Sequence, residues 1–307
     1  MAISTTGLIP NWFPPNRENY DLIVSIWKWM PVGASLQWVI SWYGMGKTSV
    51  DSRFNLPGRV AWLTMEVPGF LTLLYTMYTL SAQQHPHWGE EEEKEAEGLP
   101  YQNKVLAFLF VLHYVYRALL FPFLQPSMSP IHPVIWLNAV AFQVTNGLAI
   151  GGWLGAYGPT TAAAWGEGPG STLRFAAGLV IFYLGLAGNY YHDDELREIR
   201  RRAARRARDA ARKDGDVTKA ASIVHKHYEV PEAGLFKVVL YPHYFCEWVE
   251  WFGFWMAAGW GCLPARCFLF NEVTAMLPRA VKGRKWYAER FGEDKIRGRW
   301  AVIPGVV

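Results

Sequence analysis

A glutamate and a tyrosine stand inside long apolar segments of this sequence. Glu66 lies in the apolar segment 57–81, and Tyr114 lies in the segment 104–125. An ionisable side chain in such surroundings costs free energy, so each one marks a candidate functional site. A protonated Glu and a Tyr hydroxyl both donate hydrogen bonds, and donors aimed at one oxygen stabilise the negative charge that it gains during a reaction. The pair therefore indicates polarisation of a carbonyl group.

Two further segments carry polar stripes. The first stripe occupies positions i, i+4, i+8 and i+11 and the second i, i+4, i+7 and i+8, so each shares one helical face. Their members are Asn189, Asp193, Arg197 and Arg200, and His243, Glu247, Glu250 and Trp251. Together with the Glu and Tyr they predict a cavity with a wet cytosolic mouth. The alternatives are a helix end that pairs its own charges, glutamates that hydrogen-bond neighbouring helices, and a histidine at 113 that only packs.

Seven apolar segments are available to position these residues. A helix needs about 20 residues to cross a bilayer, at about 1.5 Å of rise per residue. The candidate segments cover residues 20–42, 57–81, 104–125, 132–156, 172–195, 236–261 and 263–281. Trp and Tyr cluster near their ends, as they do at membrane interfaces. We therefore predict an all-α polytopic membrane protein of about seven transmembrane helices; the alternative is a large soluble helical core.

Composition and charge placement agree with a membrane bundle. The chain has 307 residues, of which 51% are hydrophobic and only 18% charged, whereas soluble domains carry about 25% charged residues. Lys and Arg gather in segments 43–56 and 196–235 and in the tail from 282, while the acidic loop Gly89–Gly98 falls on the other side. The positive-inside rule then predicts a luminal N-terminus and a cytosolic C-terminus.

Other chemistries find less support. The run His192–Glu195 suggests a metal site, but consecutive helical positions point in different directions, so we predict no metal. Three cysteines lie within or beside the spans and are expected to be reduced packing residues. The basic run 197–213 is expected to face the anionic cytosolic leaflet, not nucleic acid. No signal peptide, dinucleotide fingerprint, Walker loop or hydrolase elbow is present.

Several motifs follow one another from about residue 57 to the C-terminus. They are Trp62…Glu66, His113-Tyr114…Arg117, Phe142…Thr145-Asn146-Gly147, Arg174-Phe175…Gly188-Asn189…Asp193…Leu196-Arg197…Arg200, Tyr228…Pro231…Gly234-Leu235-Phe236…Tyr244…Glu247…Glu250-Trp251…Gly253, Arg279-Ala280…Trp286-Tyr287…Phe291 and Ala301–Pro304. Their order and spacing resemble those of the steroid 5α-reductase family. The stretch Glu250–Gly253 and the pair Glu66/Tyr114 resemble the steroid branch more than the polyprenol reductases.

The resemblance implies a seven-helix protein of the endoplasmic reticulum membrane, which binds NADPH from the cytosolic side. It would reduce the carbon 4–5 double bond of a 3-oxo-Δ4-steroid or a related sterol. Glu66 and Tyr114 would polarise the carbonyl oxygen while hydride reaches carbon 5. Trp62 and Trp251 are candidate walls for a flat sterol, with ordinary packing as the alternative. The sequence names no dedicated acid for carbon 4, which water could protonate, and leaves the oligomeric state open.

The resemblance also implies a cofactor-binding set, because arginine forks suit the pyrophosphate and 2′-phosphate groups. The set comprises Asn189, Asp193, Arg197, Arg200, Tyr228, Glu247, Arg279 and Tyr287, with His243 at a position where the family usually has Asn. Met65 and Gly283 also depart from the pattern, which has Gln and His there, and the loop 125–131 lacks an expected Arg. The basic insertion 201–224 is additional and is a candidate for compensation.

We divide the chain into an N-terminal segment with the first transmembrane helix, residues 1–56, and a reductase-like membrane domain, residues 57–307. The nearest alternative functions are a polyprenol or enoyl reductase of the same family and a membrane methyltransferase that uses S-adenosylmethionine. The methyltransferase pattern resembles Pro242-His243-Tyr244…Glu247. A sterol-binding membrane protein without catalysis is a further alternative.

Overall fold

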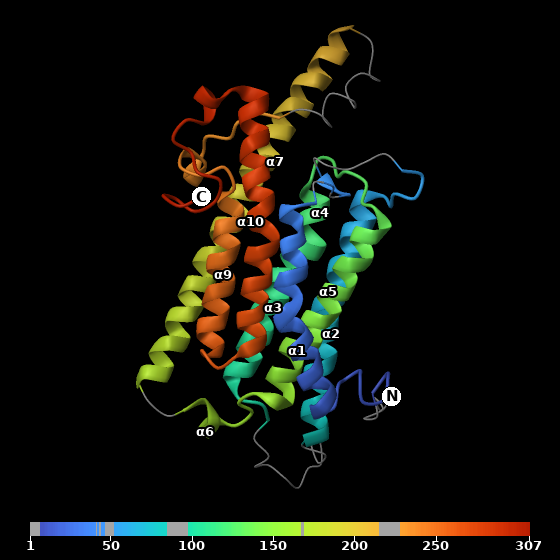
Figure 1. Ribbon diagram of the computed structural model, residues 1–307, viewed down its shortest axis with the longest axis vertical. Coiled ribbons are helices and arrows are strands. Elements are labelled where there is room, and N and C mark those ends of the chain that lie inside the picture. Colours follow the sequence, from blue (N-terminus) through green and yellow to red (C-terminus); the bar gives the residue numbers. More distant parts are fainter. Residues whose placement is uncertain are drawn as a thin grey trace.

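In the part of the chain that the structure describes, seven long helical segments run up and down through one bundle (Figure 1). The computed structural model describes residues 7–40, 42, 44–46, 52–84, 98–166, 169–214 and 228–307. The long elements are α1 (Arg17–Ser35), α2 (Gly58–Gln84), α3 (Tyr101–Tyr114), α5 (Pro133–Gly152), α7 (Pro169–Asp214), α9 (Pro242–Ala258) and α10 (Leu263–Phe291). Each of the seven predicted apolar segments overlaps one of them, which confirms the all-α membrane fold.

Four of these segments satisfy both the length and the apolar composition of a membrane span. They cover Gly58–Gln84, Tyr101–Leu124, Pro133–Tyr157 and Gly170–Asp209. Large apolar side chains are exposed on their outer faces, such as Leu71, Phe108, Leu137 and Leu184, as expected of a surface that contacts lipid instead of water. The total of seven spans and their orientation stay predictions.

Short π-helical segments extend two of the helices. Val115–Leu120 joins α3 to α4 (Phe121–Leu124), and Trp153–Tyr157 extends α5. A π-helical turn inserts an extra residue and changes which side chains face a neighbour. In the first case the change comes directly after Tyr114, at the predicted site.

Two boundaries differ from the sequence prediction. The first apolar segment, 20–42, becomes a helix that ends at Ser35 and contains Pro31, followed by the 3-10 turn Leu36–Trp38. The segment 236–261 becomes helical only at Pro242, because Gly234–Lys237 forms a separate 3-10 turn. Proline at the first helical turn costs no hydrogen bond and so favours a helix start there.

Glycines let two pairs of helices approach closely. A Cβ atom at Gly185 of α7 would lie 2.3 Å from the Glu250 nitrogen of α9, and one at Gly253 of α9 would lie 2.4 Å from the Phe182 nitrogen of α7. A Cβ at Gly151 of α5 would lie 2.8 Å from the Leu73 carbonyl of α2. Small residues at these crossings permit the backbone contact that drives helix association in lipid.

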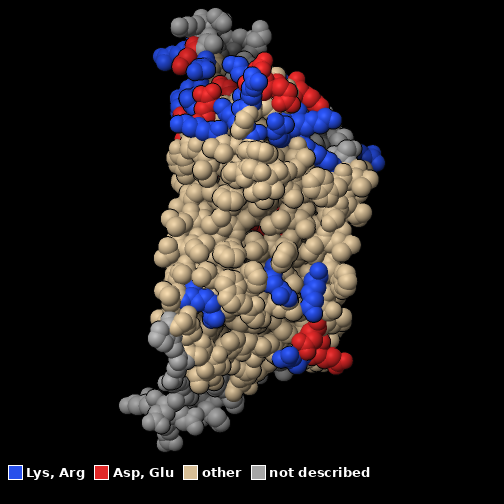
Figure 2. Space-filling view, turned by 60° about the vertical axis from the view of Figure 1, so that its left-hand side comes forward, with Lys and Arg blue, Asp and Glu red and all other residues tan. Residues whose placement is uncertain are grey.

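On the face shown in Figure 2, most charged side chains gather at one end of the bundle, next to a broad uncharged band, and a smaller group of charged side chains lies toward the other end. At the end where most charges gather, α7 continues past the apolar bundle to Asp214 and includes the basic run 197–213. The loops before α2 and α5 meet there through the Leu56–Ile131 bridge, and Lys282 Nζ donates to the Ile40 carbonyl at 2.8 Å. The acidic loop beyond Gln84 and the part of the basic insertion beyond Asp214 lie outside the described residues.

Candidate active site

A cavity of about 790 Å³ lies between α1, α2, α3, α5, α9 and α10. Ligand sites have volumes of about 300–1,000 Å³ and apolar walls with a few polar groups. Most of this wall is apolar or aromatic and includes Trp29, Met30, Trp62, Phe142, Phe268 and Met276. Its polar members include Glu66, Tyr114 and Gln143, so the structure brings the predicted Glu and Tyr to one cavity.

Amide side chains of α5 hold these two groups. Gln143 Nε2 donates a hydrogen bond to Glu66 Oε2, and Asn146 Nδ2 donates to the Tyr114 hydroxyl at 3.3 Å. Gln143 and Asn146 lie about one turn apart on α5 and are both buried. A single helix therefore positions both candidate donors, and its amides are site residues that the sequence reasoning missed. Both are polar side chains inside an apolar span, and this feature, which identified Glu66, could have identified them too.

Arg117 is the cation closest to this pair in sequence, and it lines the same cavity. Its guanidinium lies 5.1 Å from the centre of the Trp62 ring, and its backbone carbonyl accepts a hydrogen bond from Trp62 Nε1 at 2.9 Å. Its Nη1 lies 3.7 Å from Asp193 Oδ2. Trp62 thus lies on the cavity wall, as expected, and also fixes the turn that carries Arg117.

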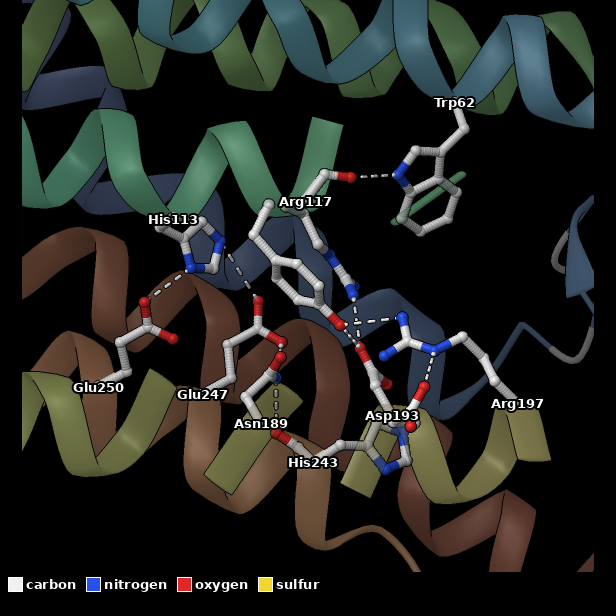
Figure 3. Close-up of polar contacts among 11 residues, drawn as sticks. Trp62, His113, Arg117, Asn189, Asp193, Arg197, His243, Glu247 and Glu250 are labelled. Atoms are coloured by element: carbon white, nitrogen blue, oxygen red, sulfur yellow. Dashed lines mark hydrogen bonds and ion pairs between the residues drawn. The ribbon is translucent and has the colours of Figure 1, made fainter. Parts of the chain in front are cut away.

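Behind the cavity, a buried network joins α3, α7 and α9 (Figure 3). His113 Nδ1 lies 2.8 Å from Glu250 Oε1, and its Nε2 lies 3.9 Å from Glu247 Oε1. Asn189 Nδ2 donates to Glu247 Oε2 at 3.1 Å and to the His243 carbonyl at 3.0 Å. Buried polar groups that hydrogen-bond one another favour one arrangement of the helices, and Glu250 Oε2 is left without a partner among the described residues. The network holds the Glu247 carboxyl group at the cavity edge.

A second group of contacts fixes the part of the predicted stripe on α7 that lies nearer the charged end of the bundle. The Tyr116 hydroxyl donates to Asp193 Oδ2 at 3.2 Å and accepts from Arg197 Nη1 at 3.1 Å. Arg197 Nε also donates to Asp194 Oδ1 at 3.0 Å, and the Arg197 side chain is fully buried. From behind the cavity, Asn189 therefore contacts α9, and Asp193 and Arg197 contact the π-helical segment Val115–Leu120. They are not among its described lining residues.

Above this network, towards the charged end, lies a second hollow of about 340 Å³. The predicted cofactor residues on its wall are Arg200, Tyr228, His243, Arg279 and Tyr287. Lys282 adds a third cation. The two hollows share lining residues, so they adjoin: Gln37, Ile40, Trp42, Met45, Tyr244 and Arg279.

Gly283 leaves space that Tyr241 fills in this upper hollow. A Cβ atom at position 283 would lie 1.7 Å from the Tyr241 hydroxyl oxygen. The Tyr241 ring in turn lies 6.4 Å from the Tyr287 ring. The family pattern has His at this position of α10, whereas Gly283 has no side chain. The ring of Tyr241, just before α9, occupies the space instead.

Trp251 occupies a different place from Trp62. It is 1% exposed and packs in the core, with its ring centre 4.4 Å from that of Phe268 and 4.7 Å from that of His113. In the part of the chain that the structure describes, it does not line either hollow. Its position suits a packing role behind two residues of the cavity wall.

Glu272 is a further polar residue of the cavity wall that sequence reasoning missed. It lies in the segment 263–281, so the cost of an ionisable group inside a span was the signal that could have found it. Within the described ranges, no group of three His, Cys, Asp or Glu side chains is placed to hold a metal ion. The three cysteines are free and buried, as expected.

The arrangement is an apolar chamber with hydrogen-bond donors on one wall, which adjoins a cationic hollow at the charged end. The sequence matches a family model described as 3-oxo-5-alpha-steroid 4-dehydrogenase over residues 129–307. It is 35% identical to an uncharacterized protein of Schizosaccharomyces pombe over 261 residues, which cover 84% of this chain and 87% of that one. It is 30% identical to 3-oxo-5-alpha-steroid 4-dehydrogenase 1 of Bos taurus, with 89% and 90% covered, and 28% identical to steroid 5-alpha-reductase DET2 of Solanum lycopersicum, with 94% and 96% covered.

Proposed function

Because this chain belongs to the 3-oxo-5-alpha-steroid 4-dehydrogenase family, we propose that it reduces the carbon 4–5 double bond of a 3-oxo-Δ4-steroid with NADPH. Membership makes the protein an oxidoreductase of the membrane. The observation that carries the finer assignment is the placement of Glu66 and Tyr114, both anchored by α5, on one wall of an apolar cavity.

The chemistry requires charge stabilisation at one oxygen. Hydride addition to carbon 5 of an enone moves a pair of electrons onto the carbonyl oxygen at carbon 3. Glu66 and Tyr114 donate hydrogen bonds to that oxygen, and their effect grows as the negative charge develops. Gln143 and Asn146 hold both donors in place beforehand, so little reorganisation is needed during the reaction. The apolar wall excludes water and accepts the flat, apolar rings of the steroid.

The cationic hollow fits a phosphorylated dinucleotide. When bound, NADPH supplies the hydride. The wall of this hollow carries three positive charges, on Arg200, Arg279 and Lys282. Guanidinium groups suit phosphate groups because their paired N–H donors match the phosphate oxygens. Tyr228 and Tyr287 offer aromatic faces for the adenosine half. The adjoining hollows let the nicotinamide half approach the Glu66 and Tyr114 wall from above.

The contacts behind the cavity give the other predicted cofactor residues positioning roles. Asn189 holds Glu247 at the edge between the hollows, where the carboxylate can orient the nicotinamide carboxamide. Asp193 and Arg197 hold Tyr116 and Arg117, so they act on the cavity through the π-helical segment after α3.

We further place the protein in the endoplasmic reticulum membrane, with seven spans, a luminal N-terminus and a cytosolic C-terminus. In this orientation the cationic hollow opens to the cytosol. The gathering of charge at that end of the bundle supports the orientation (Figure 2), because Lys and Arg accumulate on the cytosolic side of membrane proteins.

The test is mass spectrometry of a panel of Δ4-3-ketosteroids, with polyprenol and enoyl-thioester controls, incubated with the solubilised protein and deuterated NADPH. We expect one deuterium at carbon 5 of a 5α-steroid product. Deuterium transfer only to a polyprenol or an enoyl thioester would assign the chain to another branch of the family. Steroid binding without any transfer would contradict the proposed reaction.

A further inference from the structure

Glu272 is a cavity carboxyl group that the proposed reaction leaves without a role. It lies on α10, on the helical face that also carries Phe268, Ala275, Met276 and Arg279, all of which line the cavity. Spacings of three, four and seven residues bring these side chains to one face. Glu272 is therefore held toward the space in which the steroid would lie, and not toward lipid.

The carboxyl group has no partner of its own. Among the described residues it makes no hydrogen bond and no ion pair within 4.0 Å, whereas Glu66 is bound by Gln143 and Glu247 by Asn189. A carboxyl group whose oxygen atoms no protein donor occupies can turn them toward a ligand. Among the carboxyl groups of the described cavity wall, Glu272 is therefore the one that is free to exchange a proton with a substrate.

Its surroundings place it near the reacting end of the cavity. Glu272 interacts electrostatically with Glu66 of α2 and Glu247 of α9, with Arg117 of the π-helical segment after α3, and with Arg279 of its own helix. It also acts on the Tyr114 hydroxyl of α3. Glu272 approaches from α10, whereas Glu66 and Tyr114 come from α2 and α3. Glu272 thus reaches the shared cavity from a helix that carries neither of the two groups proposed to hold the carbonyl oxygen.

We propose that Glu272 is the acid that protonates carbon 4, an inference that rests on the proposed function. After hydride addition to carbon 5, the enolate has a double bond between carbons 3 and 4. Its electron pair forms a bond to the Glu272 proton, the carbon 3 carbonyl is restored, and the O–H bond of the carboxyl group breaks. The Glu272 carboxylate then recovers a proton from water. Each turnover consumes one hydride and one proton.

The step runs in reverse without cofactor, which allows a direct test. The saturated 3-ketone is incubated with the solubilised protein in D₂O without NADPH, and NMR measures deuterium at carbons 4 and 2. The Glu272 carboxylate removes the carbon 4 proton while Glu66 and Tyr114 stabilise the enolate, so wild-type protein should exchange carbon 4. Glu272→Gln should slow this exchange by about 10²–10⁴-fold, the usual contribution of a general acid or base.

Two variants and one binding measurement complete the test. Glu272→Asp keeps a carboxyl group and should retain partial exchange, and Glu289→Gln changes an exposed glutamate of the same helix and should exchange normally. Ketone affinity, measured by quenching of tryptophan fluorescence, should stay within about threefold of wild type in Glu272→Gln. Trp29 and Trp62 on the cavity wall provide the signal.

Wild-type exchange in Glu272→Gln would overturn the proposal, as would the absence of carbon 4 exchange in wild-type protein that binds the ketone. Loss of ketone affinity in step with exchange would also overturn it and make Glu272 a substrate anchor. Failure of the proposed function gives a different pattern. Glu272-dependent exchange would then persist while no deuterium passes from NADPH to a steroid.

Discussion

Glu66 and Tyr114 depend on neighbours for their effect. Each receives a hydrogen bond from an amide of α5, and Arg117 lies on the same cavity wall. A donor whose position is fixed before the reaction gains the full benefit of the charge that develops in the transition state, because no free energy is spent on aligning it. The amides are therefore part of the arrangement, although they need not touch the substrate.

Substitutions at position 66 test whether the Glu66 side chain acts as a hydrogen-bond donor or only fills space in the cavity wall. Glu66→Gln keeps an amide donor and should retain residual turnover, whereas Glu66→Ala removes the donor and should lower kcat by about 10²–10³-fold or more. Initial rates of steroid reduction in detergent measure both. Alanine activity close to that of wild type would contradict the polarising role. Tyr78→Phe, on the same helix with a side chain that is 55% exposed, is the matched control and should leave the rate unchanged.

The helices place these side chains through close crossings. At Gly185 and Gly253, α7 and α9 approach until a single added methyl group would collide with backbone atoms. The buried contacts of His113, Glu247 and Asn189 join α3 to the same two helices. The spacing of α7 and α9 therefore decides whether Glu247 reaches the cavity edge.

A methyl group at the crossing should separate the two helices. Gly185→Ala is expected to destabilise the fold by about 1–3 kcal/mol, the usual cost of overpacking, and to lower the apparent melting temperature in detergent. Gly170→Ala on the same helix meets no atom within 4 Å and should leave the melting temperature within about a degree. Equal melting temperatures for the two variants would show that the α7–α9 contact is not as close as described.

A π-helical turn follows α3, and the apolar pattern of the sequence did not predict it. The π-helical turn after Tyr114 lets Arg117 line the cavity while Tyr116 faces α7, where its hydroxyl meets Asp193 and Arg197. A regular α-helix would rotate one of these side chains away. Sequence periodicity assumes a constant turn and therefore cannot predict such a change of face.

For the whole molecule, apolar length predicted the helices and charge predicted the two ends. The sequence was less informative about which face of each helix lines the cavity. A helix that is apolar on all sides has no alternation of polar and apolar residues that would distinguish a cavity wall from the core. Trp251 was therefore expected beside Trp62 but packs behind the wall, and Glu272 was overlooked. Asn189, Asp193 and Arg197 share a helical face as predicted, yet their contacts are with α9 and with the π-helical segment after α3. The packing of segments that are far apart in the sequence determines these contacts.

The cationic hollow at one end of the molecule predicts a nucleotide-dependent gain in stability. NADPH at about 100 times its dissociation constant should stabilise the solubilised protein by about 2.7 kcal/mol, seen as a rise in melting temperature. Arg200→Ala removes a cation from the wall of the hollow and should reduce this rise far more than it reduces steroid affinity. S-adenosylmethionine should produce no rise. A rise with S-adenosylmethionine alone would favour a methyltransferase and contradict the account.

The central claim is that two ligands meet in adjoining hollows, with Glu66 and Tyr114 beside the carbonyl group of one and the nicotinamide of the other above it. A solved structure with NADP⁺ and a 3-oxo-Δ4-steroid measures this directly. We predict that the carbon 3 oxygen lies within about 3.2 Å of both the Glu66 carboxyl group and the Tyr114 hydroxyl, with phosphates near Arg200. A structure in which Glu66 points into lipid, or in which the steroid binds away from the nicotinamide, would contradict the account.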